Sequence, residues 1–190
     1  DTLTDALGDD TVNGDEGNDA ITLLSGNNVA NGGDNSDYIV TGFQNDTIDG
    51  GAGNDVIKAE GDGGFLFGNN QITGGMGNDT MIGGAGIDTF IFNTGDGTDV
   101  IGAINSVIGG GDFDYVATVL GASFQTGVDK IQLYGFSGVT ETAVIQALGG
   151  TVNGVLASDG QSTVFSADGT TIRLEGVLLS ALTECDFDFV

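Results

Sequence analysis

A nine-residue repeat constrains the fold of this 190-residue chain more than any other feature. Every ninth residue from Asp10 to Asp55 is Asp or Asn, an apolar residue follows two positions later, and the pattern resumes at Asn70 after a break. These ladder residues are Asp10, Asp19, Asn28, Asp37, Asp46, Asp55, Asn70, Asp79 and Asp88, followed in turn by Val12, Ile21, Ala30, Ile39, Ile48, Ile57, Ile72, Met81 and Phe90. Such strict phase is not a consequence of composition.

Three copies of the repeat, residues 50–55, 74–79 and 83–88, read G-G-x-G-x-D. The six Gly-rich residues predict a tight turn with positive φ angles. The next three predict a short strand whose middle residue points inward. Two successive units, 18 residues in all, would form one coil of a flattened solenoid, and the coils would stack as two parallel sheets around a ladder of apolar residues.

This unit resembles the nonapeptide of the RTX (repeats-in-toxin) family, over residues Asp5 to Ile91. The resemblance implies an all-β fold: a right-handed parallel β-roll followed by a mostly β C-terminal capping region with one or two short helices. In that family each calcium ion lies between a loop and the equivalent loop one coil further on. Asp side chains and loop carbonyls form the all-oxygen shell that calcium prefers. The implied cofactor is therefore Ca²⁺, with several ions per chain.

Alternate loops of an 18-residue coil lie on opposite edges. The first edge carries loops 14–19, 32–37, 50–55 and 74–79, and all four end in Asp. The second edge carries loops 5–10, 23–28, 41–46, 59–70 and 83–88. Loop 59–70 has six extra residues, which keep 74–79 in line with 50–55.

The second edge is degenerate. Leu23-Leu24 replaces Gly-Gly, Gln44 replaces a Gly, and Asn28 and Asn70 replace Asp. Since Asn offers one oxygen and no charge, we expect weaker calcium binding there, or none. Asn, Asp and Gly also form ordinary turns without metal, but the phase favours calcium. The candidate calcium ligands are Gly14, Glu16, Gly17, Asp19, Gly32, Gly33, Asp34, Asp37, Gly50, Gly51, Ala52, Gly53, Asp55, Gly74, Gly75, Met76, Gly77, Asp79, Gly83, Gly86, Asp88, Asp10, Asp46 and Asp99.

Composition excludes several classes of function. A net charge of −25, with 28 acidic and three basic residues, excludes nucleic acid as a partner. The same charge opposes compaction until cations bind, whereas 39% hydrophobic residues argue against permanent disorder. The chain has no His, so zinc sites of the usual kind and His-dependent catalytic triads are excluded. We expect no enzyme within this chain, although an upstream protease or lipase domain is compatible with it. The sequence contains no apolar run of 18 residues, so it predicts no membrane-spanning helix.

The second half of the chain is expected to close the roll. We place the β-roll at 1–101 and a capping and secretion-signal region at 102–190. Residues 94–101 resemble the segment that follows the repeats in many RTX proteins and would cap the open end of the roll.

Local signals predict three elements within 102–190. Asp168-Gly169 predicts a β-hairpin turn between strands around Val164 and around Ile172. Residues 140–149 predict a helix, and 178–182 a short helical turn. The single cysteine, Cys185, is expected to be a small buried hydrophobe.

Residues 127–131 and 174–190 resemble the C-terminal region of serralysin-type proteases and related exported proteins. The last five residues, 186–190, resemble the uncleaved signal of type I secretion substrates; a Phe-rich tail that packs on the core is the alternative. The chain begins at Asp1 without Met or a signal peptide, so we expect it to be the downstream part of a longer protein.

The resemblance implies a calcium-dependent folding and secretion module at the C-terminus of a larger exported protein. The ABC transporter of a type I system would be its partner, and the product would be extracellular or at the cell surface. The alternative is a surface-layer or adhesin component in which the calcium-loaded roll is itself the scaffold. Its partners would then be the cell surface or further copies of itself.

Overall fold

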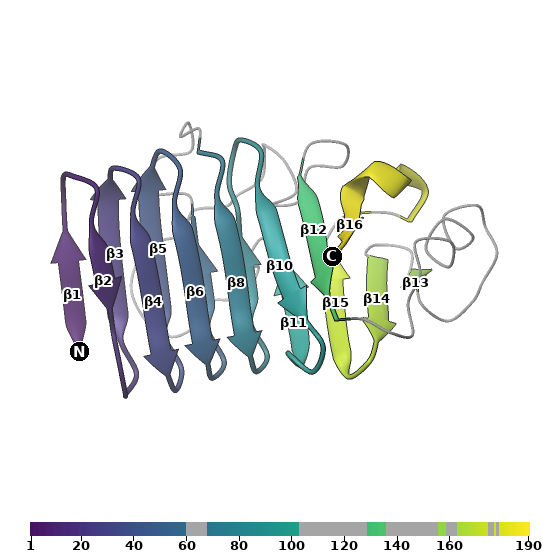
Figure 1. Ribbon diagram of the computed structural model, residues 1–190, viewed down its shortest axis with the longest axis horizontal. Coiled ribbons are helices and arrows are strands. Elements are labelled where there is room, and N and C mark those ends of the chain that lie inside the picture. Colours follow the sequence, from purple (N-terminus) through teal and green to yellow (C-terminus); the bar gives the residue numbers. More distant parts are fainter. Residues whose placement is uncertain (60–67, 103–128, 136–155, 159–162, 175–176, 178) are drawn as a thin grey trace, which may run out of the picture.

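The fold consists of two mostly parallel sheets that share one apolar core (Figure 1). The computed structural model describes residues 1–59, 68–102, 129–135, 156–158, 163–174, 177 and 179–190. One sheet has the order β1-β3-β5-β7-β9-β11-β15-β14-β13, and the other β16-β12-β10-β8-β6-β4-β2. Odd and even strands of the repeats therefore alternate between the sheets, as the predicted solenoid requires.

The strands of the first sheet are β1 (Thr2–Asp5), β3 (Ala20–Ser25), β5 (Tyr38–Phe43), β7 (Val56–Lys58), β9 (Thr80–Ile82), β11 (Thr98–Ile101), β15 (Thr170–Leu174), β14 (Thr163–Ala167) and β13 (Leu156–Ser158). Those of the second are β2 (Thr11–Asn13), β4 (Val29–Asp34), β6 (Thr47–Ala52), β8 (Gln71–Met76), β10 (Thr89–Asn93), β12 (Lys130–Tyr134) and β16 (Phe187–Phe189). Several strands are six residues long rather than the three predicted, because pairing continues into the glycines, as in Gly33↔Gly51.

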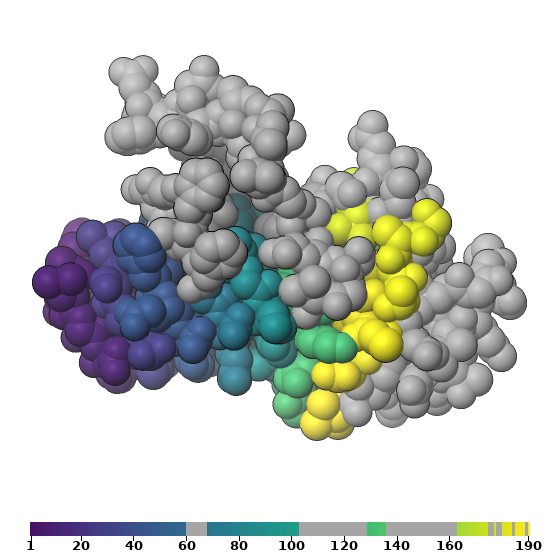
Figure 2. Space-filling view, turned by 90° about the horizontal axis from the view of Figure 1, so that it is seen from above, coloured from purple at the N-terminus to yellow at the C-terminus, as the bar shows by residue number. Residues whose placement is uncertain are grey.

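The register confirms the 18-residue coil. Ala30 lies beside Ile48 in the pairing of β4 with β6. The next pairing places Ile48 beside Ile72 and Gly51 beside Gly75, so the six extra residues of loop 59–70 leave the stack in phase, as predicted. Figure 2 shows the coils following one another along the long axis, from purple at the N-terminus to teal.

The apolar ladder forms the core. The inward residues of the repeats are at most 1% exposed: Ile21, Ala30, Ile39, Ile48, Ile57, Ile72, Met81 and Phe90. Val12 is only partly buried, because β2 lies at the end of its sheet and pairs with β4 alone. The regular burial of one side chain per strand accounts for the stacking of coils that have few other apolar residues.

The segment expected to cap the roll is instead one of its strands. Within 94–101, β11 pairs with β9 on one side and with β15 on the other. Asp99 and Ile101 point inward, at 1% and 0% exposure, and so continue the repeat pattern. Both sheets continue past residue 101, through β15 and β12. The proposed boundary at 101/102 therefore separates the repeats from the later strands in the sequence. It does not divide the structure, because both sheets contain strands from either side of it.

The predicted hairpin and short helical turn are confirmed. β14 and β15 are antiparallel, and Asp168 and Gly169 between them have positive φ angles of 47° and 84°, as a two-residue hairpin turn requires. A 3₁₀ turn, η2, spans Leu179–Ala181. The helix predicted over 140–149 lies outside the described residues.

The C-terminal tail is part of the second sheet. β16 pairs with β12, with Phe187 beside Ile131. Phe187 is 5% exposed, and its ring centroid lies 6.5 Å from that of Phe165. The expectation of a buried Cys185 is wrong: it is exposed in the 3₁₀ turn η3 (Glu184–Asp186). The Lys130 ammonium donates to the Cys185 carbonyl, so this residue contributes its backbone rather than its side chain.

Candidate calcium sites

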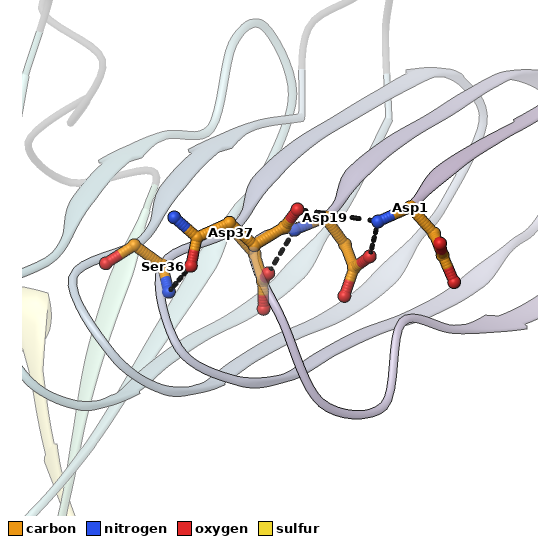
Figure 3. A network of polar contacts seen from close by, with 5 residues as sticks. Asp1, Asp19, Ser36 and Asp37 are labelled. Atoms are coloured by element: carbon orange, nitrogen blue, oxygen red, sulfur yellow. Dashed lines mark hydrogen bonds and ion pairs between the residues drawn. The ribbon is translucent and has the colours of Figure 1, made fainter.

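Buried aspartates form a continuous hydrogen-bonded ladder along the first edge. Each backbone N–H donates to Oδ1 of the aspartate one coil further on. The N···O distances are 2.8 Å for Asp19 to Asp37, 2.8 Å for Asp37 to Asp55, 2.8 Å for Asp55 to Asp79 and 3.0 Å for Asp79 to Asp99. The amino terminus of Asp1 donates to Asp19 Oδ1 in the same way (Figure 3). All five carboxylates are at most 4% exposed.

The second carboxylate oxygen of each of these aspartates is buried without a hydrogen-bond partner. Among the described residues, this holds for Oδ2 of Asp19, Asp37, Asp55, Asp79 and Asp99, and also for Oδ2 of Asp46 on the second edge. Buried polar atoms are nearly always paired, and an unpaired charged oxygen is especially costly. Five such atoms in a row along one edge indicate that a partner outside the protein completes the site.

Glycine allows these oxygens to lie close to the backbone. A Cβ atom built on Gly50 would lie 2.5 Å from both Asp55 Oδ2 and the carbonyl oxygen of Gly74. The two oxygens therefore face the same small space, which we call a cradle. Equivalent cradles adjoin Gly14, with Asp19 Oδ2 and Gly32 O, and Gly32, with Asp37 Oδ2 and Gly50 O. Two acceptor oxygens that lie near the same glycine, with no N–H or O–H donor between them, suit a cation bound beside them.

Burial and mutual repulsion perturb these carboxylates. Burial raises the pKa of Asp79 to about 7, and the negative charges of Asp99 and Asp55 add to the rise. Burial likewise raises the pKa of Asp55 and of Asp99 to about 6. Without a cation, the folded first edge therefore favours protonated carboxyl groups at a pH where the unfolded chain is ionised.

The donor set fits calcium. Among the described residues, no group of three or more His, Cys, Asp and Glu side chains is placed to hold a metal ion. A cation in a cradle would therefore depend on backbone carbonyls together with ladder carboxylates. Calcium accepts such all-oxygen shells with flexible geometry, whereas structural zinc requires Cys or His. The residues present fit the cation that the resemblance implies.

The second edge has its own ladder. The N–H of Asp10 donates to Asn28 Oδ1, and the series continues through Asp46, Asn70 and Asp88 to Asp129, with N···O distances of 2.9–3.1 Å. Asp129 is fully buried, and it is a ladder residue that the nine-residue phase does not predict. Its signal was present in the sequence, because Asp129-Lys130-Ile131 repeats the pattern of an acidic residue followed two positions later by an apolar one.

Most cradles of the second edge are filled. Leu23 and Thr41 stand where the first edge has bare glycine, and the register places Ala59 at the same level as Thr41 and Gly83. All three side chains are buried, at 1%, 0% and 4% exposure. At Gly83 the glycine returns, and a Cβ there would lie 2.5 Å from Asp88 Oδ2. Among the described residues of the second edge, a glycine beside a ladder aspartate oxygen recurs at Gly83 and Asp88, near the C-terminal end.

Four predicted ligands lie at the loop surface. The side chains of Glu16 and Asp34 are exposed, and that of Met76 is 64% exposed. The carbonyls of Asp34, Ala52 and Met76 accept backbone N–H groups from neighbouring coils. The part that these residues take in calcium binding remains a prediction, whereas the structure does bring together the ladder aspartates and the glycines at 14, 32, 50 and 74.

Comparison with known proteins identifies the repeats. A family profile described as the RTX calcium-binding nonapeptide repeat (four copies) matches residues 1–30, 31–66 and 66–90. The first 90 residues, just under half of the chain, are therefore similar to RTX calcium-binding repeats. RTX repeats bind several calcium ions and are a structural rather than a catalytic element.

No curated protein matches the chain. The crystal structure of extracellular lipase LipA from Serratia marcescens matches with a TM-score of 0.48 and 15% sequence identity. The match covers 96% of this chain and 38% of the lipase, so the chain spans well under half the length of that protein. No helix among the described residues is long and apolar enough to cross a membrane.

The raised pKa values predict the pH dependence of the calcium-free fold. The folded pKa values of Asp55, Asp79 and Asp99 exceed the ordinary value of 3.8, so their contribution to stability is present at low pH and is lost as the pH rises through about 6 to 7. In calcium-free buffer, the small fraction of chain that is folded, measured by circular dichroism, should therefore fall between about pH 5 and about pH 8. Asp79→Asn should flatten this dependence. A calcium-free fold that becomes more stable over the same range would contradict the account.

Proposed function

We propose that this chain is a calcium-dependent folding and secretion module, carried at the C-terminus of a larger protein that a type I ABC system exports. The observation that carries the proposal is the row of five buried aspartates whose Oδ2 atoms have no protein partner. A fold with these unpaired charges at its first edge is incomplete until cations bind. Folding therefore depends on the calcium concentration, which is low in the cytosol and high outside the cell.

The charge pattern suits this role. In the cytosol, where calcium is scarce, a net charge of −25 opposes compaction and keeps the repeats open for passage through a narrow channel. Outside the cell, calcium at about millimolar concentration saturates sites of modest affinity. The binding free energy then appears as folding free energy, because the cradles exist only when coils are stacked. The product of this process is an extracellular or cell-surface protein.

We place the main calcium sites between the stacked loops of the first edge. They lie between 14–19 and 32–37, between 32–37 and 50–55, and between 50–55 and 74–79. The ladder extends to Asp99, whose Oδ2 is also unpartnered, so the gap between Asp79 and Asp99 is a further candidate outside the matched repeats. On the second edge, the cradle at Gly83 and Asp88 is the remaining candidate.

The C-terminal strands supply a surface on which the repeats fold. β12 and β15 pair directly with β10 and β11, the last strands before residue 102. Thr170 joins the hairpin to the roll: its hydroxyl accepts the N–H groups of Gly95 and Asp96 and donates to the Asn93 carbonyl at 2.8 Å. A chain exported C-terminus first would present this template outside the cell before the repeats emerge.

Calcium should convert a largely disordered chain into a β-rich one. Magnesium should not replace it, because magnesium demands a tight octahedral shell and retains its water. Circular dichroism during titration with each ion measures this. A chain that is equally β-rich in excess chelator would contradict the proposed function.

Deletion of residues 186–190 separates the secretion signal from the packing role of the tail. Loss of the signal should reduce the amount of secreted protein in cells that carry the cognate transporter. The matched control is Phe187→Ala, which removes a core side chain at a cost of about 3–5 kcal/mol but keeps the rest of the tail. We expect this variant to be exported and unstable. If the deleted chain is secreted normally, the tail has only its structural role.

A further inference from the structure

The two asparagines of the second-edge ladder, Asn28 and Asn70, keep one function of the aspartates that they replace. Each is 1% exposed. Each accepts the backbone N–H of the ladder residue one coil earlier through Oδ1, at 3.1 Å from Asp10 and 2.9 Å from Asp46. The stacking hydrogen bond is therefore the same as on the first edge. The two edges differ at the second atom of the side chain, which is an NH₂ group rather than an oxygen.

That NH₂ group donates to loop carbonyls. Asn70 Nδ2 donates to Gly83 O and to Ala59 O, both at 3.3 Å. Asn28 Nδ2 donates to Gly26 O at 3.2 Å. Gly83 is the first residue of the next loop on the same edge, so its carbonyl corresponds to that of Gly74, which faces Asp55 Oδ2 on the first edge. On the first edge the carboxylate oxygen of Asp55 faces the carbonyl of Gly74, so two acceptors meet. On the second edge the NH₂ group of Asn70 donates to the carbonyl of Gly83.

We propose that the amide groups of Asn28 and Asn70 take the place of calcium at their own two levels of the second edge: Asn70 donates to the next loop and Asn28 donates within its own loop, whereas the first edge requires the ion. This inference rests on the proposed function, since it concerns which loops need calcium in order to fold. Asn28 and Asn70 would then determine the levels of the roll at which no calcium ion binds.

The charge pattern of the ladders supports this assignment. From Asp10 to Asp88 the second ladder alternates between Asp and Asn, so a neutral amide separates its carboxylates. The first ladder has five consecutive carboxylates, from Asp19 to Asp99. Adjacent negative charges raise the pKa of Asp37, Asp55 and Asp79 on the first edge, after the larger effect of burial. Electrostatic repulsion between coils is thus concentrated at the edge that has open cradles.

The filled cradles are a second, independent support. Leu23, Thr41 and Ala59 place side-chain atoms where the first edge leaves bare glycine, and all three are buried. Leu23 begins the loop that ends in Asn28, Ala59 begins the loop that ends in Asn70, and glycine and aspartate return together at Gly83 and Asp88. In these loops the first residue and the ladder residue change together, whereas in loop 41–46 Thr41 replaces the glycine while Asp46 is kept.

Reciprocal exchange of Asn and Asp tests the proposal, since the two side chains are nearly equal in size. Asn70→Asp would set a carboxylate oxygen against the carbonyls of Gly83 and Ala59, a contact that requires a cation. The number of calcium ions linked to folding is obtained from the slope of the free energy of unfolding against the logarithm of calcium concentration. We expect Asn70→Asp to raise this number by about one. Asn70→Ala, which removes the donor without adding a charge, should leave the number unchanged.

The reverse change is made on the first edge. Asp55→Asn should lower the number of linked ions by about one and still fold at lower calcium than Asp55→Ala, because the new amide can donate to Gly74 O. Asn28→Asp provides a second variant if Asn70→Asp does not fold.

The outcomes distinguish the inference from the proposed function. A wild-type slope of zero would overturn calcium-dependent folding, and the amide proposal with it. A positive wild-type slope that neither Asn70→Asp nor Asn28→Asp increases would overturn the amide proposal alone. So would an Asp55→Asn variant that needs as much calcium as Asp55→Ala. Increased slopes in the Asn→Asp variants, together with the rescue by Asn at position 55, would establish it.

Discussion

The structure depends on one contact that is unfavourable in the protein alone: a buried carboxylate oxygen that faces a backbone carbonyl. Along the first edge this arrangement recurs at Asp19, Asp37 and Asp55, each time beside a glycine whose lack of a Cβ permits the close approach. Each Oδ1 atom holds the coils in register, and each Oδ2 atom makes that register costly until a cation is bound. The same side chain therefore specifies the fold and makes it conditional.

Regular stacking alone does not require calcium. The inward ladder of Ile, Met and Phe side chains is continuous through both sheets, and the C-terminal strands extend it with Ile131, Leu133 and Phe187. This core is thin, at about one large side chain per strand, and it has to oppose the repulsion of the carboxylates. We infer that apolar burial and carboxylate repulsion nearly cancel, and that bound calcium makes folding favourable. The later strands lack the aspartate ladder of the first edge and therefore stabilise the folded state.

Much of this architecture could be predicted from the sequence, because a nine-residue phase fixes the inward residue, the turn and the register at once. The nine-residue phase predicted the pairing of Ile48 with Ile72, because the six extra residues are confined to loop 59–70 and leave the strands on either side in phase. It failed at Thr94–Ile101, where the register continues despite two extra residues between Asp79 and Asp99. It also missed Asp129, which lies beyond a long interruption. The hydrogen bonds donated by Asn70 could not be predicted, because they depend on where carbonyls of other coils point.

The most direct test of the account is a crystal structure of the chain with calcium, in which anomalous scattering locates the ions. The account predicts ions in the first-edge gaps between loops 14–19, 32–37, 50–55 and 74–79, within about 2.3–2.6 Å of the ladder carboxylates and glycine carbonyls. It predicts no ion at Asn28 or Asn70. Full occupancy at these two asparagines, with empty cradles at Gly32 and Gly50, would contradict it.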